Sequence, residues 1–175
     1  MSDAFHQITF TPTVLRAQEE YNGRASAPPE RGGTVHLTEE EIAFIKERDS
    51  FYLGTVSETG WPYIQHRGGP RGFLRVLDSQ TLAFADFRGN RQMLSVGNLK
   101  ANDRAALFLM DYNRRERLKI LGHARAEDVR HNPELARSLA MPGYPGKIER
   151  AFIIRVVATD WNCPQHITPR DRTAD

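Results

Sequence analysis

Short strand-like segments joined by short turns extend from residue 51 to residue 159, and this pattern restricts the fold more than any other feature. The segments are rich in apolar, β-branched and aromatic residues, and Gly, Pro, Asn, Asp or Ser mark most of the turns. Connections this short suit antiparallel neighbours, because a parallel pair needs a crossover of about a dozen residues or more. Strands are expected at residues 51–57, 61–67, 73–77, 81–86, 104–111, 117–128 and 149–159. An antiparallel barrel or a strongly curled sheet follows.

Helices are expected at four places, each marked by a residue that can cap or start a helix. Thr38 and Glu41 match a capping box, in which each side chain satisfies a backbone N–H at the helix start. Asn90 is a good N-cap for a helix that begins at Arg91. The expected helices cover residues 12–22, 39–48, 91–99 and a short segment from Pro133 onward.

The chain of 175 residues is expected to form a single domain, 1–175. Residues 1–37 look like a peripheral segment with one short helix, followed by a connection rich in Pro, Gly and Ser at residues 24–33. Residues 161–175 contain two prolines, so they are expected to form an extended tail.

Composition excludes several classes of protein. The net charge of +2 gives no strong attraction to nucleic acid or to a membrane surface. Cys163 is the only cysteine, so no intramolecular disulfide can form, and the longest apolar run is too short to span a bilayer. No secretory signal is visible, and the expected location is the cytoplasm. The sequence has no P-loop, no GxSxG and no GxGxxG between a strand and a helix.

Two arginine-bearing motifs each follow a strand-like run. QHRGG comprises residues 65–69, and DFRGNRQ comprises residues 86–92. Arg suits bidentate contacts to phosphate, Gly allows close approach to the backbone, and free N–H groups at a helix start bind anions. Strand alternation places Gln65 and Arg67 on one face and His66 on the other. The motifs therefore indicate a phosphate-bearing ligand, although an ordinary turn with solvated arginines and a structural His66 fit them too.

A third motif, WNCPQH, comprises residues 161–166. Cys163 and His166 could form a thiol–histidine nucleophile, but the motif shows no obvious orienting group. Trp161 beside polar amides fits packing against a flat ligand or a second subunit better. The histidines lack the close spacing of metal ligands and the chain lacks a cysteine pair, so no metal site is expected.

In combination these motifs resemble the pyridoxamine 5′-phosphate oxidase-like proteins, the FMN-binding split-barrel family, and in particular a bacterial subgroup of it. The resemblance extends over residues 10–170 and rests on FTPTV, QHRGG, DFRGNRQ and WNCPQHI. It implies a mainly β (α+β) fold, a six-stranded antiparallel split β-barrel with flanking helices. It also implies a homodimer with FMN at the subunit interface and the C-terminal tail, residues 161–175, at that interface.

The resemblance also assigns cofactor-binding residues. In the family, the strand that corresponds to QHRGG lines the flavin ring and phosphate. Asp86 and Phe87 correspond to a pair of residues at the end of a later strand. Asn90, Arg91 and Gln92 correspond to a Ser-Arg-Lys type motif that clamps the phosphate. Gln92 stands where Lys is usual, so Arg67 or Arg88 is expected to supply the second cation. Trp161 matches a Trp that covers the flavin from the second subunit. The implied set is Gln65, His66, Arg67, Gly68, Asp86, Phe87, Arg88, Asn90, Arg91, Gln92, Arg117, Trp161, Gln165 and His166.

The expected function is that of an FMN-dependent oxidoreductase whose substrate the sequence does not specify. A flavin carries hydride or electron transfer itself, so no catalytic side chain is assigned. Enzymes of the family that oxidise vitamin B6 carry Arg-x-His after the C-terminal Trp, whereas this chain has Gln165-His166-Ile167. Two alternatives remain, a non-enzymatic flavin-binding or flavin-sensing protein and a protein that holds haem or deazaflavin in the same cleft. Haem would need an axial ligand such as His66 or His166.

Overall fold

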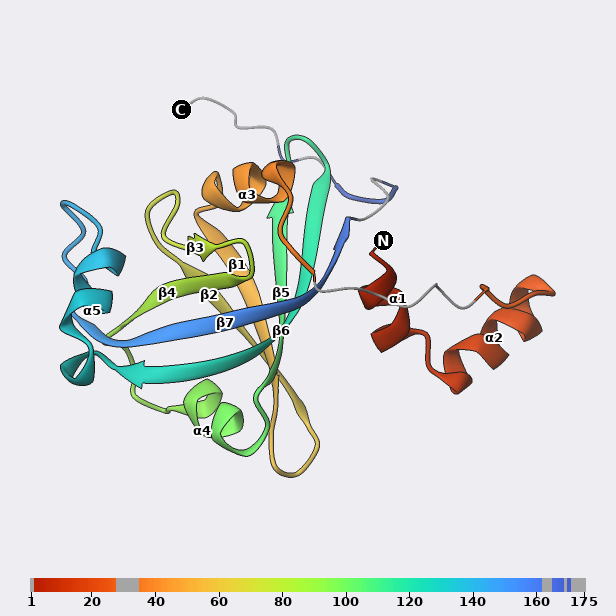
Figure 1. Ribbon diagram of the computed structural model, residues 1–175, viewed down its shortest axis with the longest axis horizontal. Helices are drawn as coiled ribbons and strands as arrows, with labels where there is room; N and C mark the ends of the chain where they lie inside the picture. The colour runs from red at the N-terminus through yellow and green to blue at the C-terminus, as the bar shows by residue number, and fades with distance from the viewer. Residues whose placement is uncertain (1, 28–34, 162–164, 169, 171–175) are drawn as a thin grey trace.

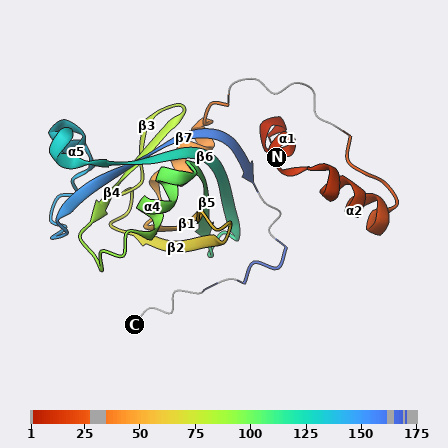
Figure 2. The same cartoon turned by 90° about the horizontal axis from the view of Figure 1, so that it is seen from below.

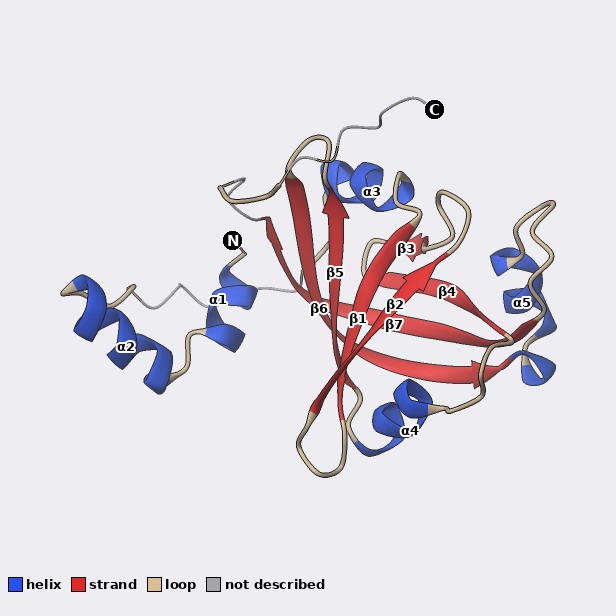
Figure 3. Ribbon diagram, turned by 180° about the vertical axis from the view of Figure 1, so that it is seen from behind, coloured by secondary structure: helices blue, strands red, loops and turns tan. Residues whose placement is uncertain are grey.

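A computed structural model describes residues 2–27, 35–161, 165–168 and 170. Seven strands form one antiparallel sheet in the order β2-β1-β5-β6-β7-β4-β3, with β2 and β3 at its edges. The sheet curls on itself as a split barrel (Figures 1 and 3). The strands are β1 (Ser50–Val56), β2 (Pro62–Gly68), β3 (Arg75–Asp78), β4 (Thr81–Phe87), β5 (Arg104–Asp111), β6 (Glu116–Asp128) and β7 (Ile148–Trp161).

Helices flank the barrel. α3 packs against β3. α4 packs against β1 and β6, and α5 packs against β4 and β7 (Figure 2). α1 packs against β7, and α2 extends away from the barrel (Figure 1). The helices are α1 (Asp3–Thr9), α2 (Pro12–Asn22), α3 (Glu39–Lys46), α4 (Leu94–Ala101) and α5 (Pro133–Leu139), with a 3-10 turn η1 (Val129–His131). None of the helices in the described residues is long and apolar enough to cross a membrane.

Aromatic side chains fill the barrel interior and connect strands that are distant in the sheet. Phe51 of β1 lies edge-on to Phe84 of β4, with ring centroids 5.2 Å apart, and Phe84 stacks on Phe152 of β7 at 4.9 Å. Phe73, in the loop before β3, also stacks on Phe51. Because these contacts cross the barrel, burial of the rings holds the two sides of the curled sheet together.

The expected fold class is confirmed, and the strands lie within about two residues of their expected positions. The sheet has seven strands, one more than the resemblance implied, because the four-residue β3 pairs with β4 at one edge. The capping box of α3 is also confirmed: the Thr38 hydroxyl accepts from the Glu41 N–H, and the Glu41 carboxylate accepts from the Thr38 N–H.

The expected start of the helix after DFRGNRQ is wrong. α4 begins at Leu94, three residues after Arg91, and Met93 occupies the N-cap position without a side-chain cap. The chain cannot be helical earlier, because Arg91 has φ of 60° and Met93 has φ of 58°, both in the left-handed region. Asn90 instead accepts a hydrogen bond from the Gln92 N–H through its own side chain, at 3.2 Å, which is a turn contact.

The N-terminal segment contains an unexpected helix as well as the expected one. α1 is held on the barrel by Ser2, whose hydroxyl donates to the Thr159 carbonyl of β7 at 2.7 Å, and Phe5 is buried. α2 matches the expected helix, with Thr11 as N-cap and Gly23 as a left-handed C-cap. None of the α2 side chains is buried in the described chain.

Gly122 is required at a register shift between β6 and β7. Its position pairs with Val156, whereas the preceding Leu121 pairs with Ala158, so one β7 residue bulges out. A Cβ at Gly122 would lie 2.7 Å from both the Arg155 carbonyl oxygen and an Ile154 methyl. We therefore expect Gly122→Ala to destabilise the fold by about 1–3 kcal/mol, measured by urea unfolding.

Gly97→Ala is the matched control. Gly97 lies in α4 with open space around its Cβ position, so Ala should raise the free energy of unfolding by about 0.5–1 kcal/mol. If both substitutions changed stability alike, the close packing at Gly122 would not be the cause.

Candidate functional site

A hollow of about 210 Å³ lies where the QHRGG and DFRGNRQ motifs meet. Its lining comes from β2, the end of β4, the loop from Gly89 to Met93, the first turn of α4 and the start of β7. We call it the arginine pocket and define it by Arg67, Asp86, Arg91 and Arg150. The two motifs therefore lie side by side, as the sequence indicated.

Asp86 lies between two arginines at the bottom of the pocket. Its Oδ1 accepts from Nη1 of Arg67 at 2.8 Å, and its Oδ2 accepts from Nε of Arg150 at 2.7 Å. Asp86 and Arg150 face each other because β4 and β7 pair in that register, whereas Arg67 comes from the edge strand β2. The Arg67 guanidinium also lies 4.9 Å from the ring centre of Phe152. These contacts fix Arg67 across the split between β2 and β4.

A second carboxylate lies at the rim. Oε1 of Glu149 accepts from Nη2 of Arg91 at 2.9 Å and lies 3.8 Å from Nε of Arg88, while Oε2 lies 3.5 Å from Nη2 of Arg150. The hydrogen bond from Arg91 lowers the pKa of the Glu149 carboxyl below its ordinary value of 4.5. Glu149 is therefore ionised at neutral pH and joins three arginines around the pocket.

The first turn of α4 faces the same hollow. Leu94, Ser95 and Val96 line the pocket, and the helix start at Met93 has no side-chain cap within the described chain. Backbone N–H groups at an uncapped helix start are donors for an anion. The Ser95 hydroxyl donates to Oε1 of Gln65 at 3.0 Å, which fixes the Gln65 amide at the wall. The helix start that was expected at Arg91 therefore lies three residues later, and its first turn still lines the hollow.

Arg67 retains an unused donor. Its Nε is buried, and it has no hydrogen-bond partner among the described residues. A buried N–H without an acceptor is costly, so such groups usually have a ligand or a water nearby.

The pocket brings together seven of the expected site residues and leaves three of their neighbours outside it. Strand alternation turns His66 and Gly68 to the outer face of β2, where His66 lies edge-on to Tyr52 with ring centres 5.7 Å apart. Arg88 points toward Glu149 at the rim. The seven lining residues are Gln65, Arg67, Asp86, Phe87, Asn90, Arg91 and Gln92.

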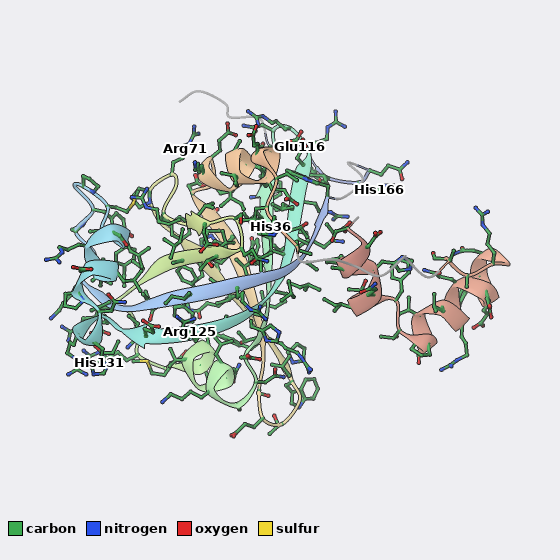
Figure 4. The ribbon with its side chains drawn as sticks, viewed as in Figure 1. His36, Arg71, Glu116, Arg125, His131 and His166 are labelled. Atoms are coloured by element: carbon green, nitrogen blue, oxygen red, sulfur yellow. The ribbon has the colours of Figure 1, made fainter. Side chains whose placement is uncertain are left out.

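The remaining expected residues lie elsewhere in this chain. Trp161 packs edge-on against Phe44 of α3 at 4.9 Å, and Arg117 lies 5.7 Å from the ring centre of Phe108. Gln165 and His166 are exposed, and Figure 4 shows His166 beyond the end of β7, on the opposite side of the molecule from His131. The other tail residue considered as a nucleophile, Cys163, lies outside the described residues.

The length of β7 separates Trp161 from its own pocket. Arg150 and Trp161 are eleven positions apart along this strand, which corresponds to roughly 35 Å of extended chain. Trp161 therefore lies outside the arginine pocket of its own chain.

The sequence interpretation missed Ser95, Glu149 and Arg150. Glu149 and Arg150 stand at the start of the last strand and looked like ordinary polar strand residues. Only the pairing of β4 with β7 shows that Arg150 faces Asp86, which is 64 residues earlier in the chain. Ser95 was placed in the interior of the expected helix and not in its first turn.

Comparison with known proteins adds an independent finding. The sequence model of the family described as pyridoxamine 5′-phosphate oxidase matches residues 37–158. This match includes β1 to β6, most of β7 and all the residues that line the arginine pocket. No curated protein matches the sequence.

Solved structures share the fold at low sequence identity. HupZ of Group A Streptococcus gives a TM-score of 0.55 at 14% identity, over 77% of this chain and 100% of that chain. A Clostridium acetobutylicum protein related to general stress protein 26 of B. subtilis, of the pyridoxinephosphate oxidase family, gives 0.54 at 17%, over 74% and 88%. An F420 reductase gives 0.51 at 19%, over 71% and 98%. These structures establish the fold.

Asp86→Asn tests whether the central carboxylate holds the barrel together. The change leaves the partly buried Arg67 without its counter-charge and Arg150 with Glu149 alone, so we expect a loss of about 2–3 kcal/mol, or about 5–10 °C in Tm. Asp103→Asn is the control, because Asp103 forms an exposed pair with His123 and its loss should cost under about 0.5 kcal/mol. Equal melting temperatures for the two variants would contradict the role of Asp86.

Proposed function

This chain belongs to the pyridoxamine 5′-phosphate oxidase family, and on that premise we propose that it binds FMN in the arginine pocket and acts as a flavin-dependent oxidoreductase. The charge balance of the pocket is the observation that carries the proposal. Four arginines, at positions 67, 88, 91 and 150, face two carboxylates, Asp86 and Glu149. This leaves a surplus of two positive charges, which matches a phosphate monoester at neutral pH.

The pocket residues fit an FMN phosphate. Arg91 and the first N–H groups of α4 would hold the phosphate oxygens. The buried Nε of Arg67 would gain the acceptor that it lacks among the described residues. Arg67 and Arg150 supply the positive charge that a Lys would bring at position 92, where this chain has Gln.

When bound, FMN supplies the hydride or electron transfer, so the protein need only bind, orient and tune the cofactor. Gln65 is held at the pocket wall by Ser95 and offers an amide to the polar edge of a flavin ring. Asp86 keeps Arg67 and Arg150 in fixed positions, which limits the reorganisation that binding requires.

We further propose that the protein acts as a homodimer. The pocket of about 210 Å³ is smaller than the roughly 300–1,000 Å³ of typical small-molecule sites, so a second subunit would complete it. An apolar hollow of about 760 Å³ lies on the outer face of β1, β2, β5 and β6, and Ile64 at its edge is 67% exposed. Exposed apolar surface of this kind marks an interface. In a dimer, Trp161 and the tail at residues 161–175 would reach the partner's pocket.

Light scattering tests the dimer. The wild-type mass should be that of two chains, and Ile64→Lys should give monomers, because it places a charge in the proposed apolar interface. Leu77→Lys is the control: Leu77 is 44% exposed on β3, away from this face, and its replacement should leave the mass unchanged. A monomeric wild-type protein would exclude the shared site.

A non-enzymatic flavin-binding role uses the same pocket and differs only in turnover. Deazaflavin remains an alternative ligand for the same pocket, because an F420 reductase shares the fold. Haem fits less well, because His66 is on the outer face of β2 and His166 is exposed beyond β7. The absorbance spectrum of the purified protein separates flavin, deazaflavin and haem, and flavin reduction with an acceptor present tests for turnover.

The single cysteine continues to favour a cytoplasmic location.

Arg91→Ala tests the phosphate contact. It should weaken FMN binding by about 1.5–3 kcal/mol, because one charge-assisted hydrogen bond is lost. His166→Ala should weaken FMN binding less, since His166 lies outside the pocket of its own chain. Equal FMN affinity of the wild type and Arg91→Ala in a fluorescence titration would remove Arg91 from the site.

A further inference from the structure

Glu149 is an acid inside an otherwise cationic site. Its carboxylate accepts from Arg91 at 2.9 Å and lies within 3.8 Å of Arg88 and 3.5 Å of Arg150. Its side chain is only 16% exposed, and it lines a neighbouring hollow that shares Arg91 and Arg150 with the arginine pocket. A carboxylate in this position takes the same guanidinium hydrogen bonds that a phosphate oxygen would take.

We infer that Glu149 is a built-in competitor of the ligand's phosphate, so that a doubly charged phosphate monoester is needed to take Arg91 from it. This inference rests on the proposed function, since it concerns the same pocket. A phosphate monoester carries close to two charges at neutral pH, whereas a carboxylate or a phosphodiester carries one. A singly charged anion that displaces Glu149 from Arg91 gains no charge attraction there, whereas the FMN phosphate does.

The structure lets Arg91 change partners. Arg91 has a 55% exposed side chain and lies in the loop where it and Met93 adopt left-handed backbone conformations. Such conformations are unfavourable for non-glycine residues, so this loop has little local preference for its present form. Glu149 keeps Arg150 as a neighbour after Arg91 leaves, so its charge is not left alone.

Asp86 cannot act in the same way. It is 6% exposed and bonded on both oxygens, so a ligand would have to break two partly buried ion pairs to displace it. The two carboxylates of the pocket therefore have different roles: Asp86 fixes arginines, and Glu149 can release one.

Titration with FMN and riboflavin tests the inference. Glu149→Gln removes the competing charge but keeps a similar shape, so FMN should bind about three- to fivefold more tightly, as expected for loss of one exposed ion pair. Riboflavin has no phosphate, and its affinity should not change. Asp128→Asn is the control, because Asp128 lines the same neighbouring hollow as Arg91 and Glu149 but pairs with Arg130. It should change FMN affinity by less than about twofold.

A pH series gives a second readout that a purely structural role would not change. Between pH 7 and pH 5 the FMN phosphate loses its second charge, with a pKa of about 6, while Glu149 stays ionised because its pKa lies below 4.5. The site without Glu149 is more positive and favours the doubly charged phosphate more, so FMN affinity should fall more steeply in Glu149→Gln than in the wild type. The other charged groups at Glu149 are Arg88, Arg91, Asp128, Arg130, Lys147 and Arg150.

The outcomes are separable from those of the proposed function. If the wild type binds FMN and Glu149→Gln binds it equally or more weakly, Glu149 positions Arg91 and the inference fails. If Asp128→Asn tightens FMN as much as Glu149→Gln does, the effect is general electrostatics and the inference also fails. If neither the wild type nor the variants bind FMN while all of them melt cooperatively, the proposed function itself fails. If Glu149→Gln does not fold, Glu149→Ala is the second variant, and it should also bind FMN more tightly than the wild type.

Discussion

The bonding of Asp86 to Arg67 and Arg150 connects the parts of this structure that the sheet alone leaves separate. β2 is an edge strand, and the sheet order places it far from β4 and β7. Arg67 crosses that split to reach Asp86, and its guanidinium lies against Phe152 of the aromatic core. The barrel is therefore closed by apolar contacts inside and by one partly buried ion-pair cluster at its edge.

The same cluster determines what the pocket can bind. An aspartate that neutralises one of two arginines leaves the site cationic, and the uncapped start of α4 adds backbone donors on the opposite wall. A site of this kind stabilises an anion without a metal ion or a catalytic acid–base pair. Fold stability and ligand charge are thus linked through Asp86, while Glu149 adjusts how strongly the site attracts its ligand.

Much of this arrangement could be predicted from the sequence, because it depends on local patterns. The alternation in QHRGG placed Gln65 and Arg67 on one face, and short turns placed that motif near DFRGNRQ. The helix start at Asn90 could not be predicted correctly, since nothing in the sequence signals left-handed conformations at Arg91 and Met93. Glu149 and Arg150 could not be found, because their contacts depend on strand pairing between distant parts of the chain.

A crystal structure of the protein grown with FMN tests the central claim most directly. The account predicts phosphate density at the first turn of α4, within hydrogen-bond distance of Arg91 and close to the Nε of Arg67. It also predicts that Asp86 keeps both of its arginine partners. Phosphate density elsewhere, for example over the apolar hollow beside Ile64, would contradict the assignment of the arginine pocket as the cofactor site.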